Sequence, residues 1–203
     1  FQRRRILDRR QIARVAALLP ADRILYSQRR PAGSGHRPPW RWDWGLELGP
    51  CPAAKPDILS LHERRAGEGV ADAGQRLAAA SRRARLLKLA VPVDALAELA
   101  EGDRWAREDP DRRVFLPRSR DGRWAWYRLL LGRRARLNFF REGPGSAPDQ
   151  PLLLDWVEHK DPVDRFAAIL GDPVAHSRTP AEHSSWFGAH GMPVYAIALG
   201  AAE

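Results

Sequence analysis

Short apolar runs recur along the 203 residues, separated by helix-like segments or by turn residues. Runs of this kind, bounded by Gly, Pro and Asp, are typical of strands buried in a sheet. Helical spacing of apolar residues occurs between them, over 9–19, 70–83 and 93–100. This alternation predicts an α/β protein. The predicted strands cover 23–27, 43–48, 57–61, 85–91, 113–117, 137–140, 166–170 and 194–199.

Two Gly- and Pro-rich stretches, 31–39 and 143–151, punctuate this pattern. The second marks a boundary, because a new strand-turn-helix pattern begins at Phe166. We therefore expect a first region over 1–150, a linker over 151–165 and a second region over 166–203. Since the chain begins at Phe and its only methionine is Met192, we also expect a fragment of a longer protein.

Composition excludes several classes of protein. No run reaches the ~20 apolar residues that a membrane span requires, and the arginines after Phe1 are not followed by the apolar core of a secretory signal. A single cysteine, Cys51, leaves no internal disulfide framework. We expect a cytoplasmic protein with no membrane partner.

The net charge of +9 raises the alternative of nucleic-acid binding. Its arginines are interleaved with acids, as in Arg107-Glu-Asp-Pro-Asp-Arg-Arg113, and no basic-aromatic strand is present. We therefore expect no nucleic-acid partner. The alternative predicts binding to generic DNA or RNA that weakens steeply with salt.

Lysine is rare, with only three among 34 basic residues, and Lys88 lies inside the apolar run 86–91. Burial favours the neutral amine, which is the form that attacks a carbonyl carbon to make an imine. The alternative is an edge strand whose lysine reaches solvent. His62 directly follows the preceding strand, at the end where barrels of parallel strands carry catalytic groups. A nucleophile and a general base on successive strands predict one catalytic site.

Four motifs occur in order: Ser60-Leu-His62-Glu, Leu87-Lys88-Leu-Ala-Val, Arg128-Leu-Leu-Leu-Gly and Ser146-Ala-Pro-Asp-Gln150. Together they resemble the type I 3-dehydroquinate dehydratases over about residues 23 to 150. The resemblance implies an incomplete (β/α)8 TIM barrel in the first region, truncated at its N-terminus. It also implies Schiff-base dehydration of 3-dehydroquinate to 3-dehydroshikimate in the shikimate pathway of aromatic amino acid biosynthesis.

The resemblance assigns a role to each matching residue. Lys88 is implied to form the imine, and His62 to remove the C2 proton and then to assist the departure of the C1 hydroxyl. Arg128 is implied to bind the substrate carboxylate, which suits the bidentate geometry of arginine. Ser146 and Gln150 are implied to belong to a loop that closes over the substrate.

Upstream, Ser27-Gln-Arg29 is similar to the family's third-strand motif, and Asp43 and Glu47 lie in its acidic fourth-strand region. These three residues are implied to contact substrate, with an internal ion-pair network as the alternative. The sequence departs from the family pattern at 31–35, at Gly45 where an acid is usual, and at Asp149 where glycine is commoner.

The second region resembles the opening of the substrate-binding domain of shikimate dehydrogenases over about residues 166 to 199. Ser177 and Thr179 occupy the positions of the family's hydroxyl pair, which binds the shikimate carboxylate; the alternative for Thr179 is a helix N-cap. No G-x-G-x-x-G motif is present, so NADP is implied only for the part of that domain that the sequence lacks.

Taken together, the two resemblances imply a fused bifunctional enzyme of which this chain is an internal piece. The implied partners are small molecules, namely 3-dehydroquinate at the first site and shikimate or 3-dehydroshikimate at the second. The dehydratase needs no cofactor beyond Lys88, no metal site is expected around His176 and His183, and a homodimer is compatible with the sequence. A Schiff-base aldolase and a non-catalytic remnant are the alternative functions.

Overall fold

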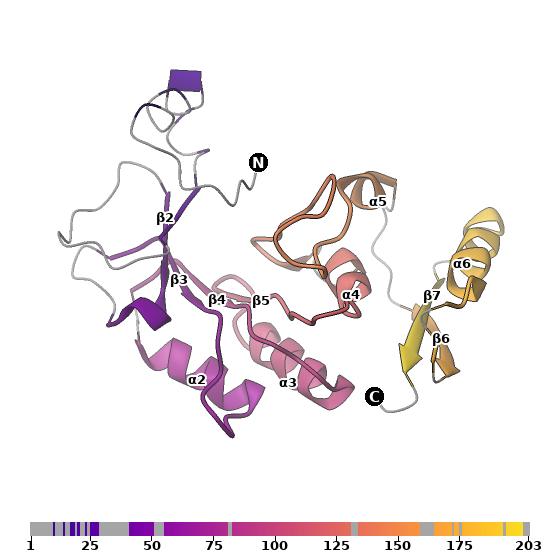
Figure 1. The fold of residues 1–203 in the computed structure, drawn as a ribbon, viewed down its shortest axis with the longest axis horizontal. Helices are drawn as coiled ribbons and strands as arrows, with labels where there is room; N and C mark the ends of the chain where they lie inside the picture. The colour runs from indigo at the N-terminus through magenta and orange to yellow at the C-terminus, as the bar shows by residue number, and fades with distance from the viewer. Residues whose placement is uncertain are drawn as a thin grey trace. The chain divides into compact units, whose positions relative to one another are not determined.

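The structure is a computed structural model of the chain. The residues it describes are 10, 14, 17–18, 20, 23, 25–28, 41–50, 55–80, 83–130, 134–158, 165–171, 173–174, 176–192 and 194–200, which Figure 1 draws in colour. The chain divides into two compact units: Phe1–Pro92 with Ala100–Pro117, and Val93–Leu99 with Arg118–Glu203.

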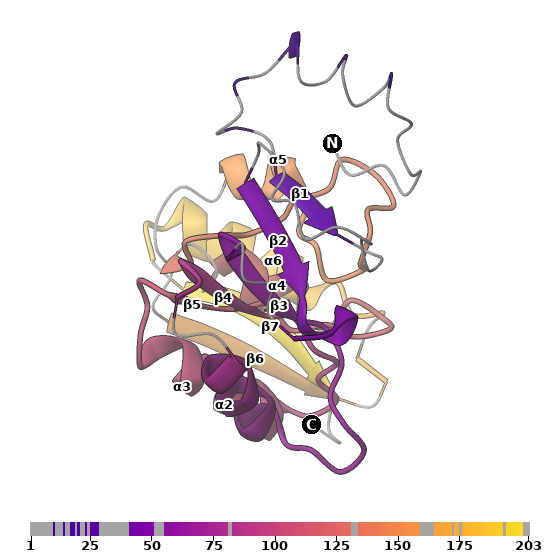
Figure 2. The ribbon, with the colours of Figure 1, turned by 90° about the vertical axis from the view of Figure 1, so that its left-hand side faces the viewer.

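The first unit is built on a parallel sheet of five strands. Its strands are β1 (Leu25–Gln28), β2 (Arg41–Gly45), β3 (Ile58–Leu61), β4 (Leu86–Leu89) and β5 (Arg113–Phe115). They lie side by side in chain order, each parallel to the one before it (Figure 2). All five strands therefore end at the same edge, where a parallel sheet gathers residues distant in sequence.

Two helices cover one face of this sheet. Helices α2 (Val70–Ala80) and α3 (Leu96–Arg107) lie on the same side of the strands in Figures 1 and 2. Phe115 faces α3, because a Cβ added at Gly102 would come within 2.2 Å of its ring. Phe115 is in register with Leu89, so the helix side of the sheet is the apolar side.

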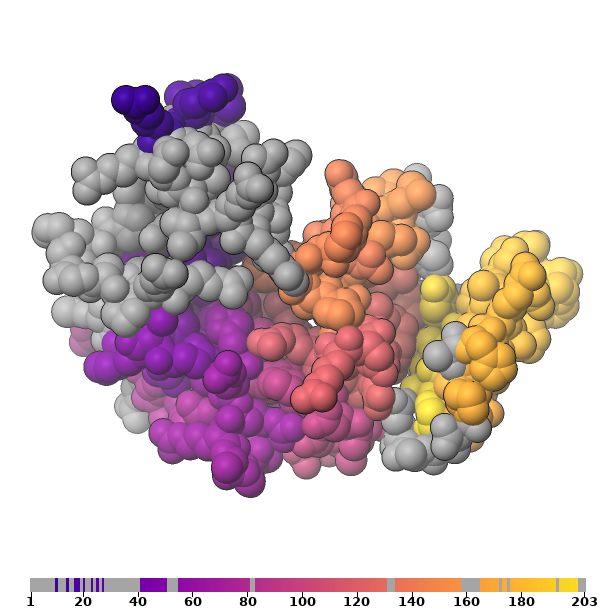
Figure 3. Space-filling view, in the orientation of Figure 1, coloured from indigo at the N-terminus to yellow at the C-terminus, as the bar shows by residue number. Residues whose placement is uncertain are grey.

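The side chains of β3 and β4 alternate between the two faces. Leu61 and Leu89 belong to the helix side and are 1% and 0% exposed. Ser60 and Lys88, in register with each other, point to the opposite face. Helix α2 contacts both strands and contributes Leu77, also fully buried, and its outer residues form the lower surface of this unit in Figure 3. The apolar layer thus leaves the polar residues on a face of their own.

The second unit contains two short helices and a strand-helix-strand unit. The short helices are α4 (Ala125–Leu130) and α5 (Leu153–Glu158). Strands β6 (Arg165–Gly171) and β7 (Val194–Gly200) are parallel, and helix α6 (Thr179–Ala189) connects them and packs on β7. The expected strand-turn-helix pattern after residue 166 is confirmed.

Most of the predicted strands are confirmed, with two differences. Strand β2 starts and ends earlier than expected, since residues Leu46–Leu48 form the short 3-10 helix η2. The run 137–140 is not a strand: the side chain of Asn138 accepts the Phe139 N–H and donates to the Arg128 carbonyl, and such local bonds compete with a ladder. The helix predicted for 9–19 lies mostly outside the described residues.

The described strands form an open five-stranded sheet and a separate two-stranded sheet, so the fold is α/β with parallel sheets and no closed barrel is seen among them. The predicted helix over 93–100 begins later, at Leu96, and continues to Arg107.

None of the helices in the described ranges has the length and apolar character needed to cross a bilayer. The region boundaries at 150 and 166 stay predictions.

Candidate active site

Lys88 is buried in the interior of the first sheet. It is the third residue of β4, which has β3 on one side and β5 on the other, and it is 5% exposed. Its ammonium group donates a hydrogen bond to the carboxylate of Asp43 on β2. The edge-strand alternative is therefore wrong, because β4 is a central strand and the lysine is paired rather than solvated.

Asp43 gathers donors from three other strands. Its carboxylate, 2% exposed, accepts hydrogen bonds from Lys88, from the Ser60 hydroxyl on β3 and from the Ser27 hydroxyl on β1 at 3.0 Å. The Lys88 amine is therefore in contact with a buried proton acceptor, and two serine hydroxyls hold that carboxylate in place.

His62 and Glu47 form a second pair on the same side of the sheet. His62 follows the last residue of β3 and is two positions beyond Ser60, so it shares the face that Ser60 and Lys88 occupy. One carboxylate oxygen of Glu47, Oε1, accepts the backbone N–H groups of His62 and Glu63. The other, Oε2, lies 3.4 Å from Nδ1 of the His62 ring.

The charge of Glu47 is set by these contacts. Burial is the largest single influence and raises its pKa, but the hydrogen bonds from the ring and backbone of His62 together outweigh it. They lower the pKa of Glu47 from the ordinary value of 4.5 to about 2. At neutral pH Glu47 is therefore an acceptor that faces the imidazole.

Gly45 provides the space for this contact. A Cβ at this position would lie 2.8 Å from Oε2 of Glu47 and 3.7 Å from Nδ1 of His62. A side chain at this position would therefore displace the glutamate that contacts the histidine.

The structure thus brings four of the predicted residues, Lys88, His62, Asp43 and Glu47, to one sheet face. A lysine that would attack a carbonyl and a histidine that would move a proton are the two groups that imine chemistry requires. Ser60 was missed by the sequence analysis, although its position two residues before His62 placed it on the same face. The predicted Arg29 lies outside the described residues.

Arg128 belongs to the second unit and is 3% exposed. Its guanidinium donates to Asn138 Oδ1 at 3.3 Å and to the Phe139 carbonyl at 3.2 Å, and its buried Nε has no hydrogen-bond partner in the described part of the chain. Burial lowers its pKa from 12.5 to about 10, and the charge of Asp149 opposes this effect. The group therefore stays protonated at neutral pH with two neutral oxygens as its partners.

Ser146 and Gln150 contact each other in a short loop. The Ser146 N–H donates to the Gln150 side-chain oxygen at 2.9 Å, and the Gln150 carbonyl accepts from Arg141 Nε at 2.7 Å. Between them Gly145 has a φ of +63°, a left-handed conformation that favours glycine. The loop is closed on itself by these bonds.

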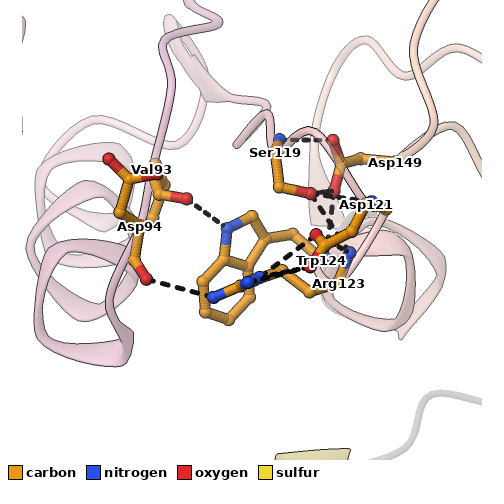
Figure 4. A network of polar contacts seen from close by, with 8 residues as sticks. Val93, Asp94, Ser119, Asp121, Arg123, Trp124 and Asp149 are labelled. Atoms are coloured by element: carbon orange, nitrogen blue, oxygen red, sulfur yellow. Dashed lines mark hydrogen bonds and ion pairs between the residues drawn. The ribbon is translucent and has the colours of Figure 1, made fainter. Parts of the chain in front are cut away.

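Asp149, in the same loop, is completely buried and anchors a neighbouring turn. Figure 4 shows its carboxylate against Ser119 and Trp124. It accepts the Ser119 N–H at 2.6 Å, the Ser119 hydroxyl at 2.7 Å and the Trp124 N–H at 3.0 Å, and the Trp124 indole donates to the Val93 carbonyl at 2.7 Å. Asp149 is therefore a structural anchor of the loop.

Ser177 and Thr179 meet at the start of α6. The Thr179 N–H donates to the Ser177 hydroxyl at 3.3 Å. The N-cap position is Arg178 and Thr179 is the first residue of the helix, so the alternative that Thr179 is itself the N-cap is wrong. Among the described residues no group of three or more His, Cys, Asp and Glu is arranged to hold a metal ion.

Fold and site together define an α/β protein with a buried lysine-aspartate pair and a histidine-glutamate pair on one face of a parallel sheet. No family model matches the chain, and no curated protein matches it. One matching solved structure is the dehydroquinate dehydratase and shikimate dehydrogenase from S. pombe AroM, at 18% identity and a TM-score of 0.36. The match covers 70% of this chain and 29% of that one. Similarity at this level assigns neither a family nor an activity.

Proposed function

We propose that the first region is the imine-forming part of a type I 3-dehydroquinate dehydratase and that the second is the start of a shikimate dehydrogenase substrate-binding domain. The observation that carries the proposal is Lys88, an amine buried in a central strand with a proton acceptor in contact and His62 on the same face. The motif resemblance supports the choice of substrate.

In the first step the Lys88 ammonium transfers a proton to Asp43. The free amine then adds to the ketone carbon of 3-dehydroquinate, and loss of one water forms the carbon-nitrogen double bond. Asp43 is suited to this role because its carboxylate already accepts a hydrogen bond from Lys88. The Ser60 and Ser27 hydroxyls hold that carboxylate in place.

Asp43 returns its proton to the imine nitrogen. In the second step neutral His62 takes the C2 proton, and the electron pair moves toward the protonated imine nitrogen. The protonated His62 then gives this proton to the C1 hydroxyl, which leaves as water. Hydrolysis of the imine releases 3-dehydroshikimate and regenerates Lys88. No resident cofactor is used, and NADP would serve only the dehydrogenase.

Arg128 is proposed to bind the substrate carboxylate. A buried guanidinium with neutral partners and an unpartnered Nε within the described residues retains its attraction to an anion. Ser146 and Gln150 are proposed to be loop residues near the substrate. Glu47 is proposed to lie close to the substrate as well. Ser177 and Thr179 are proposed to bind the carboxylate of shikimate or 3-dehydroshikimate.

The sheet supports the proposal of an incomplete barrel. The described sheet has five parallel strands in chain order with α2 and α3 on the same face, which is the arrangement that a (β/α)8 barrel requires. A doubly wound sheet instead reverses its strand order and carries helices on both faces. A cytoplasmic location stays part of this proposal.

Borohydride reduction in the presence of 3-dehydroquinate, followed by peptide mass spectrometry, tests the proposed function. We expect one adduct, at Lys88. Lys55 and Lys160 are internal controls because they are the only other lysines. An adduct at either of them, or none, would contradict the proposal, and carbon-carbon cleavage without water loss would indicate an aldolase.

Loss of the adduct in a Lys88→Met variant is meaningful only if the variant folds. The single substitution leaves the buried Asp43 carboxylate without its cation, so a Lys88→Met, Asp43→Asn double variant is the companion. A folded double variant without adduct supports the assignment, and a folded double variant that still forms the adduct contradicts it.

A further inference from the structure

We propose that Asp149 is a positioning residue, which holds the loop of Ser146 and Gln150 on the start of helix α4 before any substrate is bound. The two substrate-binding groups proposed above, this loop and Arg128, are then fixed relative to each other. All of these residues belong to the second compact unit. The consequence for substrate binding rests on the proposed function, whereas the state of the loop does not.

The base of the loop is closed by Arg141. Two backbone hydrogen bonds of 3.0 Å join Arg141 to Pro151 and Leu153, on the far side of the loop. The Arg141 guanidinium also donates to the Gly143 carbonyl at 2.9 Å. The loop therefore begins and ends at one point, and its tip needs a contact of its own to be held in place.

Asp149 provides the contact that holds the tip. It is 0% exposed and accepts three hydrogen bonds, two from Ser119 and one from the Trp124 N–H (Figure 4). The Ser119 hydroxyl in turn accepts the N–H groups of Gly122 and Arg123, at 2.9 and 3.1 Å, so its direction is set by the turn. The loop is thus fixed to the turn that precedes α4 by a fully buried side chain.

Trp124 connects this turn to Arg128. Its carbonyl accepts the Arg128 N–H at 3.2 Å, and its indole, 0% exposed, donates to the Val93 carbonyl at 2.7 Å. Asp149 and Arg128 are therefore joined through the backbone of one immobilised residue. Burial lowers the pKa of Arg128 and the charge of Asp149 opposes this effect, so the same carboxylate also favours the charged guanidinium.

Gly122 shows that the loop and the turn are closely packed as well as hydrogen-bonded. A Cβ at this residue would lie 3.1 Å from the Pro148 carbonyl oxygen. Its φ of +85° is in the left-handed region that favours glycine. A side chain here would press on the loop directly beside Asp149, so glycine allows the close approach that the aspartate needs.

Amide hydrogen exchange of the unliganded chain tests the state of the loop. The N–H groups of Ser146 and Gln150, both hydrogen-bonded within the loop, should be protected in the parent. In Asp149→Asn the side-chain NH₂ group meets the Ser119 N–H, so exchange at both amides should become about 10- to 30-fold faster. Unprotected loop amides in the parent, or equal rates in the parent and the variant, would overturn the proposal.

Two control variants separate the anchor from charge and from general stability. Glu142→Gln removes an exposed carboxylate of the same loop and should leave the loop rates as in the parent. Ile197→Ala opens a cavity in β7 and lowers the stability of the same unit without touching the loop. Because the loop opens locally, its rates should stay unchanged in this variant; equal acceleration in Ile197→Ala and Asp149→Asn would overturn the proposal.

Ser119→Ala keeps the test decisive if Asp149→Asn does not fold. It removes one of the three hydrogen bonds and keeps the carboxylate, so the loop amides should exchange about 3- to 10-fold faster than in the parent. Unchanged loop rates in a folded Ser119→Ala variant would contradict the anchor.

Kinetics with 3-dehydroquinate separate positioning from a structural role. A released loop must be ordered at the expense of binding energy, so Asp149→Asn should raise KM by about 10-fold and change kcat by less than about twofold. A merely structural role lowers the folded fraction, and therefore kcat, with KM unchanged, and this result would overturn positioning. If the parent shows neither turnover nor a borohydride adduct, the proposed function fails, whereas the exchange rates still decide whether Asp149 holds the loop.

Discussion

Among the described residues two cations are buried, one in each compact unit, and they are stabilised in different ways. Lys88, 5% exposed, donates to the Asp43 carboxylate. Arg128, 3% exposed, donates only to the neutral oxygens of Asn138 and Phe139, and no carboxylate of the described residues forms an ion pair with it. The lysine is paired directly with a carboxylate, whereas the arginine is influenced by the charge of Asp149 without an ion pair to it in the described part of the chain.

The difference separates two uses of a buried charge. A buried lysine in contact with a carboxylate has a proton acceptor beside it, which suits a group that must become a nucleophile. A guanidinium keeps its charge at neutral pH even when burial lowers its pKa to about 10, which suits an anion-binding group. The buried carboxylates differ in the same sense: Asp43 accepts a hydrogen bond from a cation, whereas Asp149 accepts hydrogen bonds from the neutral groups of Ser119 and Trp124.

The largest expected effect follows from breaking the ion pair of the first unit. Asp43→Ala breaks the buried ion pair with Lys88 and removes the acceptor of two serine hydroxyls, so the free energy of unfolding should fall by about 3–5 kcal/mol. Urea unfolding measures this loss. Ser27→Ala, at the exposed end of the same network, is the control and should cost under about 1 kcal/mol. Equal losses in the two variants would show that the ion pair is not the source.

A smaller loss is expected at the buried carboxylate of the second unit. Asp149→Asn keeps one oxygen for the Ser119 hydroxyl and the Trp124 N–H, but its NH₂ group then meets the Ser119 N–H. The mismatch should cost about 2 kcal/mol in urea unfolding. Asp121→Asn, which weakens a surface ion pair with Arg123, should cost under about 1 kcal/mol. An unchanged free energy of unfolding in Asp149→Asn would contradict the role of this carboxylate as an anchor.

The pH dependence of stability tests the charged state of Glu47. Its pKa is about 2 in the folded chain against an ordinary value of 4.5, so its contribution is complete above pH 4.5 and is lost as the pH falls toward 2. Allowing for its partial exposure, we expect this contribution to be about 1–2 kcal/mol. The pKa of Glu68 is also lowered to about 2, chiefly by Arg76, so the parent must be compared with Glu47→Gln. The difference between their unfolding free energies should shrink between pH 5 and 2.5; a constant difference would contradict the lowered pKa.

Much of the first unit could be predicted from sequence because its buried strands are continuous runs of apolar residues. Apolar runs marked β3, β4 and β5, and a lysine inside one of them identified the site residue. The partner of that lysine could not be identified as such, since the contact of Asp43 with Lys88 depends on the register of three strands. The serine hydroxyls that complete the network were missed for the same reason.

The second unit was harder to predict because side-chain to backbone bonds shape it. The apolar run at 137–140 has strand-like composition, but the Asn138 amide bonds to the Arg128 carbonyl and to the Phe139 N–H. Helix α4 is only six residues long and carries no clear amphipathic period. The motif residues Arg128, Ser146 and Gln150 were found by resemblance, whereas their contacts depend on loop geometry that local composition does not encode.

The smallest expected effect sharpens the comparison of the two cations. Arg128→Met removes a buried charge whose hydrogen-bond partners are neutral. The desolvation cost that it relieves offsets the two hydrogen bonds and the charge interaction with Asp149 that are lost. We expect the free energy of unfolding to change by less than about 1 kcal/mol, in contrast to Asp43→Ala. If Arg128 binds an anion, sulfate at about four times its Kd should raise the free energy of unfolding of the parent by about 1 kcal/mol. It should raise that of the variant by much less. A loss of about 3 kcal/mol or more in Arg128→Met, with equal sulfate effects in both proteins, would show that this arginine serves the fold and does not bind an anion.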